Sequence, residues 1–315
     1  MATVSRKAIL AIGASALAAG PRAVRAQQLE TLHLAGVPTD DVTPVFYALK
    51  NGMYQKAGVD LQWVQTSSGT AATTAVVTGT YELGKASPIA PILAHLRGLP
   101  IVVVANGVIS TPRTPFSAML VATDSPIRTG AECNGKIGVS PGLSDINSLA
   151  MEAWIDKNGG DSKTVKWVEV PGSAAAEAIA EHRVDFALLQ EPQLSAALAL
   201  GKVRVLADAY AAVSERWITS SYITNVEFAA KHADALRKFV RVTYEAAGYT
   251  NSHKSETVPM MSERTKIPLE TYTKLTRGDG STATDPALLQ PIIDMAVRYK
   301  VLSRSFPAKE MYWSA

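Results

Sequence analysis

Two stretches of the sequence predict the same order of secondary-structure elements, and this duplication constrains the fold more than any other feature. Each stretch predicts a strand, a helix, a second strand, a helix rich in small residues and a third strand. The first stretch occupies residues 32–84 and the second residues 136–188. Two βαβαβ units of this kind predict two similar α/β lobes, each with a mostly parallel sheet.

The two stretches also carry the same landmarks at nearly the same spacing. A strand glycine precedes a tryptophan by 27 positions in the first stretch (Gly36 and Trp63) and by 29 in the second (Gly138 and Trp167). The acidic residue at the third predicted strand follows each tryptophan by 19 and 18 positions, respectively. These matched landmarks argue against a chance similarity between two α/β segments.

The remaining segments predict how the two lobes are joined. Residues 118–122 predict a strand that crosses from the first lobe into the second, and residues 218–223 predict a strand that crosses back. We therefore expect lobe 1 to comprise residues 27–118 plus 223–315 and lobe 2 to comprise residues 119–222, with a cleft between them.

The N-terminus predicts a cleavable secretory signal peptide over residues 1–26. Arg6 and Lys7 precede an uncharged run at 8–19, and Val24-Arg25-Ala26 has the compact residues that a signal peptidase reads. The uncharged run is too short to span roughly 30 Å of hydrocarbon. Sec export is favoured over the twin-arginine route because the second arginine is missing, and we expect a periplasmic protein.

The charge and the cysteine content exclude several functions. The 315-residue chain has a net charge of +3, but four positive charges and no acidic residue lie before residue 27. Subtracting these four charges leaves −1, which gives no support to nucleic-acid binding. The single cysteine, Cys133, excludes an intramolecular disulfide and a cysteine-ligated metal site. We expect Cys133 in the core, no cofactor or metal, and a monomer.

The one nucleotide-like motif is incomplete. Residues 79–85 have the GxxxxGK spacing of a phosphate-binding loop, but Ala86 stands where a Ser or Thr would reach magnesium. A helix also precedes this loop, where the motif requires a strand. Nucleotide binding is therefore not expected.

The loops that follow the predicted strands are the candidate binding site, because ligands of open α/β sheets bind beyond the carboxyl ends of the strands. Several of these loops precede helices and carry hydroxyl groups, namely Ser67, Ser68, Thr70, Ser144 and Ser173. Helix N-termini with small polar side chains favour an anion, although each hydroxyl is equally explained as a helix cap. Asp40, Asp41 and Glu191 instead suit a donor group such as an amine or aminopyrimidine.

Taken together, several motifs resemble those of a known family: the periplasmic substrate-binding proteins of ABC importers that take up sulfonates, taurine, nitrate and thiamine-precursor pyrimidines. The resemblance covers nearly all of the chain after the signal peptide. It rests on Gly36-Val37-Pro38, residues 48–60, residues 79–84, residues 135–139 and Gln190-Glu191-Pro192.

The resemblance implies a type II, Venus-flytrap fold, whose two α/β lobes close on a small ligand and deliver it to a membrane permease. It implies a transient partnership with an ABC permease and no catalysis. Two alternatives stay open: an enzyme on the same fold, desulfinase-like or pyrimidine-synthase-like, and a ligand-presenting sensor subunit. The candidate ligand-binding residues carried over from the family are Asp40, Ser67, Ser68, Ser87, Ser140, Ser144 and Glu191.

Overall fold

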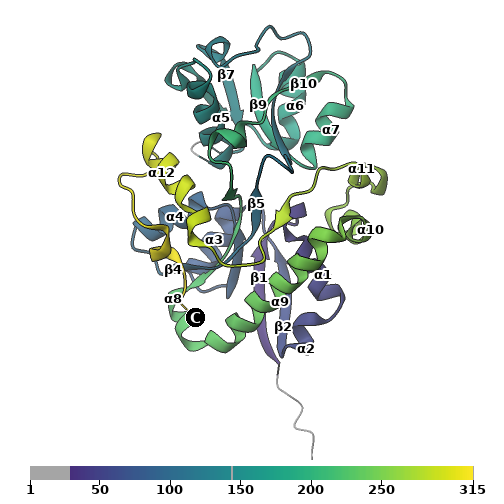
Figure 1. Ribbon diagram of the computed structural model, residues 1–315, viewed down its shortest axis with the longest axis vertical. Helices are drawn as coiled ribbons and strands as arrows, with labels where there is room; N and C mark the ends of the chain where they lie inside the picture. Colours follow the sequence, from purple (N-terminus) through teal and green to yellow (C-terminus); the bar gives the residue numbers. More distant parts are fainter. Residues whose placement is uncertain (1–28, 143–144, 315) are drawn as a thin grey trace, which may run out of the picture.

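The computed structural model (Figure 1) describes residues 29–142 and 145–314, so the predicted signal peptide and Ser144 lie outside the described residues. The described chain forms two α/β lobes, each built on a five-stranded sheet, with short strands between them. The prediction of two α/β lobes is therefore confirmed. In the described part of the chain, no helix has the length and apolar character needed to cross a membrane.

The sheet of lobe 1 has the order β2-β1-β3-β12-β4. Strands β1, β2 and β3 are parallel, and β12 inserts antiparallel between β3 and β4. The bounds are β1 Glu30–Gly36, β2 Val59–Gln65, β3 Leu83–Ala86, β4 Ile101–Asn106 and β12 Ser221–Asn225.

The sheet of lobe 2 repeats this plan, in the order β10-β6-β9-β7-β8. Here β7, β8 and β9 are parallel, and β6 runs antiparallel between β10 and β9. The bounds are β6 Ser117–Ala122, β7 Ile137–Ser140, β8 Lys166–Glu169, β9 Phe186–Gln190 and β10 Val203–Ala207.

The first crossing between the lobes differs from the prediction, whereas the predicted return segment 218–223 begins at the end of the observed return strand β11 and runs into β12. The chain crosses through β5 (Val108–Ser110) and returns through β11 (Trp217–Ile218), and β13 (Asp279–Gly280) pairs with the other edge of β5. The predicted crossing segment 118–122 lies in β6 instead, where every residue is buried within the sheet of lobe 2. Its apolar run reflects burial on both faces of a central strand.

Helices cover both sheets, and short 3₁₀ turns lie at residues 40–42, 131–133, 162–164, 209–212, 286–288 and 308–311. The helices are α1 Thr43–Lys50, α2 Met53–Lys56, α3 Gly69–Val77, α4 Ile89–Leu96, α5 Ile146–Lys157, α6 Gly172–Ala180, α7 Gln193–Ala199, α8 Val226–Lys231, α9 Ala233–Ser252, α10 Lys254–Thr265, α11 Leu269–Thr273 and α12 Gln290–Arg298.

One apolar cluster continues from lobe 1 into lobe 2 through α12. Helix α12 contacts α4 of lobe 1 and α5 of lobe 2 (Figure 1). Beyond its end, the Tyr299 hydroxyl donates to Oδ2 of Asp156 on α5, at 2.9 Å. Cys133 is fully buried in the same cluster, as expected, and burial raises the pKa of its thiol to about 12.

The glycine and tryptophan landmarks of the two stretches meet in space. A Cβ atom added to Gly36 would lie 2.8 Å from Cη2 of Trp63, and one added to Gly138 would lie 2.6 Å from Cζ3 of Trp167. In each lobe the glycine of the first strand thus leaves room for the indole of the next strand. The matched spacing in the sequence therefore reflects the same packing of a glycine against a tryptophan in both lobes.

We predict that Gly138→Ala lowers the free energy of unfolding by about 1–3 kcal/mol, because the new methyl group overpacks the site. Its Cβ would also lie 2.6 Å from the Phe186 ring. Gly172→Ala is the matched control, because its Cβ would have its nearest neighbour at 3.7 Å. Denaturant unfolding of both variants checks this, and equal stability of the two would contradict it.

A second prediction concerns Glu152 on α5, where burial, with a smaller contribution from nearby Asp156, raises the pKa to about 7 from 4.5. A carboxyl whose pKa is higher in the folded state than in the unfolded state stabilises the protein at low pH. The protein loses this stabilisation as the pH rises from 4.5 to about 7. Glu152→Gln should therefore raise the Tm by about 2–4 °C at pH 8 and leave it nearly unchanged below pH 4.5. A shift of the same size at both pH values, or the same shift in exposed Glu177→Gln, would contradict this.

Candidate functional site

A cavity of about 650 Å³ lies between the lobes, at the carboxyl ends of their strands. Lobe 1 contributes the loops after β2 and β3 together with one face of α3 and α4. Lobe 2 contributes the loop after β7, the start of α5 and the ends of β8 and β9. The polar lining residues are Ser68, Thr70, Thr73, Thr74, Ser87, Arg97, Asp145, Asn147, Glu169 and Gln190.

Two helix N-termini converge on the lobe-1 side of this cavity. Ser68 caps α3 by accepting a hydrogen bond from the Ala71 N–H at 3.1 Å, and α4 begins two residues after Ser87. Gly69 lets α3 approach the end of β3, because a Cβ there would lie only 3.2 Å from the Cα of Ala86. The free N–H groups and positive dipole ends of both helices therefore face one space, which suits an anion.

The Ser87 hydroxyl is an available hydrogen-bonding group at this point. Its Oγ is buried and has no hydrogen-bond partner among the described residues, and Ser87 lines the cavity. Buried polar atoms normally have a partner. The arrangement therefore leaves the Ser87 hydroxyl to bind a ligand.

The lobe-2 wall presents acceptors and amides in fixed orientations. Asp145 caps α5 by accepting from the N–H groups of Asn147 and Ser148, and the buried Ser140 hydroxyl donates to the same oxygen at 2.6 Å. Burial raises the pKa of Asp145, and these hydrogen bonds offset part of that rise. Ser140 therefore orients the Asp145 carboxylate. Asp145 lines the cavity, whereas Ser140 does not.

Gln190 is positioned by a buried amide network. Its Nε2 donates to Oδ1 of Asn147 at 3.1 Å and to the Tyr210 hydroxyl at 2.6 Å, and Tyr210 donates to the same Asn147 oxygen at 2.7 Å. Sequence reasoning missed Asn147 and Arg97 as lining residues. The position of Asn147 in the first turn of a helix after a strand was the available signal.

Like Ser140, three further predicted residues do not line the cavity. Ser67 is exposed beside the cavity without lining it. Oδ1 of Asp40 accepts from Nε of Arg277 at 2.7 Å and from the Tyr272 hydroxyl at 2.8 Å. Glu191 accepts from the N–H and hydroxyl of Ser195 at 3.0 and 2.7 Å. Direct ligand contact by these three residues stays a prediction.

The pKa of Glu191 responds to its surroundings. Burial raises the pKa of its carboxyl, while hydrogen bonds from Ser195 and from the backbone N–H of Thr276 oppose that rise. Thr276 lies between α11 and β13, whereas Glu191 follows β9 of lobe 2. A backbone group outside lobe 2 therefore influences the pKa of this lobe-2 carboxyl.

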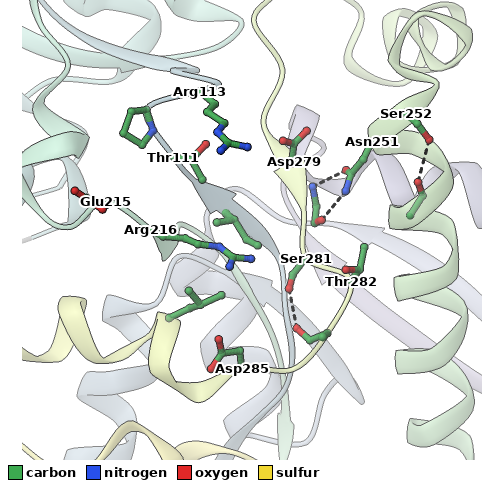
Figure 2. Close-up of a pocket in the computed structure, with 16 residues that line it drawn as sticks. Thr111, Arg113, Glu215, Arg216, Asn251, Ser252, Asp279, Ser281, Thr282 and Asp285 are labelled. Atoms are coloured by element: carbon green, nitrogen blue, oxygen red, sulfur yellow. Dashed lines mark hydrogen bonds between the residues drawn. The ribbon is translucent and has the colours of Figure 1, made fainter.

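A larger cavity of about 900 Å³ lies against the crossing strands (Figure 2). Arg113 and Arg216 project into it from the lobe-2 ends of the crossing segments. Glu215, Asp279 and Asp285 are its acidic lining residues. Asp279 pairs with Lys254 at 2.6 Å, and Asp285 accepts from the Ala287 N–H. Among the described residues, no group of three or more His, Cys, Asp or Glu side chains is placed to hold a metal ion.

The fold and the cavity define a two-lobed protein of the periplasmic-binding-protein fold. The crystal structure of the aliphatic sulphonate binding protein SsuA from Escherichia coli superposes with a TM-score of 0.75 at 20% identity, over 90% of this chain and 92% of that chain. The structure of the alkanesulfonate-binding protein SsuA from Xanthomonas axonopodis pv. citri, bound to MOPS, superposes with a TM-score of 0.73 at 17% identity. This match covers 91% of this chain and 99% of that chain.

The sequence comparisons place the chain in a family. A putative aliphatic sulfonates-binding protein of Escherichia coli K12 is 24% identical over 260 residues, covering 80% of this chain and 79% of the relative. The family described as NMT1/THI5 like matches residues 39–257. The chain belongs to this family.

We predict that Arg277→Met lowers the free energy of unfolding by about 3–5 kcal/mol, because it leaves the Asp40 carboxylate buried without its cation. The two side chains are 6% and 13% exposed. Adding Asp40→Asn to Arg277→Met should recover part of the loss. Denaturant unfolding measures both, and a double variant no more stable than the single one would contradict this account.

Proposed function

We propose that this protein is the extracytoplasmic solute-binding component of an ABC-type importer and captures a small organic anion of the sulfonate or carboxylate type. The observation that carries the proposal is the cavity between the lobes, where the N-termini of α3 and α4 meet beside the unpartnered Ser87 hydroxyl. An anionic head group there accepts hydrogen bonds from backbone N–H groups and from Ser87.

Capture follows from the placement of the two walls. The lobe-1 wall binds the anion, and Gln190, Asn147 and Asp145 approach from lobe 2. A ligand that contacts both walls stabilises the closed arrangement and shifts the population toward it. The sulfonate-binding relatives and the MOPS complex, in which the bound molecule is itself a sulfonate, support this ligand class.

The protein binds its ligand without converting it. Its cysteine is buried in the core, away from the residues that line the cavity, and burial holds the thiol in its protonated form. The signal peptide over residues 1–26 directs export to the periplasm, where a monomer delivers ligand to the permease.

We predict that an alkanesulfonate such as butanesulfonate raises the Tm of the mature protein and binds in titration calorimetry. Ser87→Ala should weaken binding about tenfold, because the anion loses a hydrogen bond. Ser303→Ala, at an exposed serine outside the cavity, is the control.

Equal affinity of the Ser87 and Ser303 variants would contradict this site. Mass spectrometry of the ligand after incubation separates binding from turnover: unchanged ligand supports a binding protein, and a converted product supports the enzyme. Loss of sulfonate uptake in a deletion strain of the source organism would support the transport role.

A further inference from the structure

The cavity between the lobes continues as a groove along two helices of lobe 1. Its α3 side consists of Thr70, Thr73, Thr74 and Val77, and its α4 side consists of Ile89, Ala90, Leu93 and Ala94, followed by Arg97. These residues recur at the three- and four-residue spacing that keeps side chains on one face of a helix. The lining spans the whole of α4, which is eight residues and therefore about 12 Å long.

The walls of this groove are mostly apolar. Val77, Ile89 and Leu93 line it. The hydroxyl of Thr73 is already satisfied within α3, because it donates to the Gly69 carbonyl at 2.8 Å. Both walls belong to one lobe, so the groove does not depend on how far the lobes have closed. It suits a hydrocarbon chain that leaves the anion site along the helices.

The far end of the groove carries a cation. Arg97 directly follows α4, is exposed, and lines the cavity together with Leu99. Within residues 29–142 and 145–314, no acidic side chain forms an ion pair with Arg97. Its guanidinium is thus available to a carboxylate or sulfonate, which it can bind through two hydrogen bonds.

From this geometry we propose that the ligand is an elongated dianion. One anionic group binds at the N-termini of α3 and α4 beside Ser87, an apolar chain follows the groove, and the second anionic group pairs with Arg97. This inference rests on the proposed function and adds the class of substrate.

The test compares three carboxylates in titration calorimetry of the mature protein: decanedioate, decanoate and butanedioate. Decanedioate should bind at least tenfold more tightly than either of the others, since butanedioate lacks the chain and each buried methylene contributes about fourfold. Arg97→Gln should weaken decanedioate binding about tenfold and leave decanoate unchanged. Arg237→Gln, at an exposed arginine on α9, is the matched control and should change neither.

A second variant tests the path of the chain. Thr74 is exposed and lines the middle of the groove, so Thr74→Trp should fill it at little cost to folding. Decanedioate and decanoate should then bind about tenfold more weakly, with butanedioate unchanged.

The outcomes separate this inference from the proposed function. Equal affinity for decanedioate and decanoate, or an equal loss of both in Arg97→Gln, would overturn the dianion while the anion site stands. Failure of all three carboxylates and of butanesulfonate to bind would overturn the proposed function and the inference with it.

Discussion

The approach of α3 to the β3–α4 loop at Gly69 is the contact on which the binding site depends. A Cβ at this position would lie 3.2 Å from the Cα of Ala86 and 3.4 Å from the nitrogen of Ser87. Without a side chain here, the N-termini of α3 and α4 face the same space, and in the proposed site their unpaired N–H groups bind one anion. The groove between α3 and α4 starts at the same point. The packing at Gly69 therefore positions both the proposed anion site and the groove that leads away from it.

Closure of the site is governed by contacts outside the cavity. The lobes are joined by short paired strands and by the packing of α12 on α5. Asp40 and Arg277 fix the start of α1 against the segment that precedes β13. Asp40, which was predicted to touch the ligand, thus also has a structural contact, and its ligand contact stays a prediction.

The sequence was sufficient to predict the two lobes, because a glycine and a tryptophan at matched spacing mark the same strand packing in each. The loop pattern also predicted Ser68 and Ser87, and both line the cavity, while their contact with a ligand stays a prediction. The same pattern also predicted Asp40 as a ligand-binding residue. It could not show that Asp40 pairs with Arg277, because that arginine lies 237 residues away in the sequence. Arg97 was missed for a similar reason: only the packing of α3 beside α4 shows that a residue at the end of a helix belongs to the ligand cavity.

The central claim is that a small organic anion binds between the lobes, at the start of α3 and α4. A crystal structure of the mature protein grown with 2-bromoethanesulfonate tests it most directly, because bromine gives an anomalous signal that locates the ligand without bias. This account predicts a bromine peak in the cavity between the lobes, with the sulfonate beside Ser87. A peak in the cavity against the crossing strands, near Arg113 and Arg216, would contradict it.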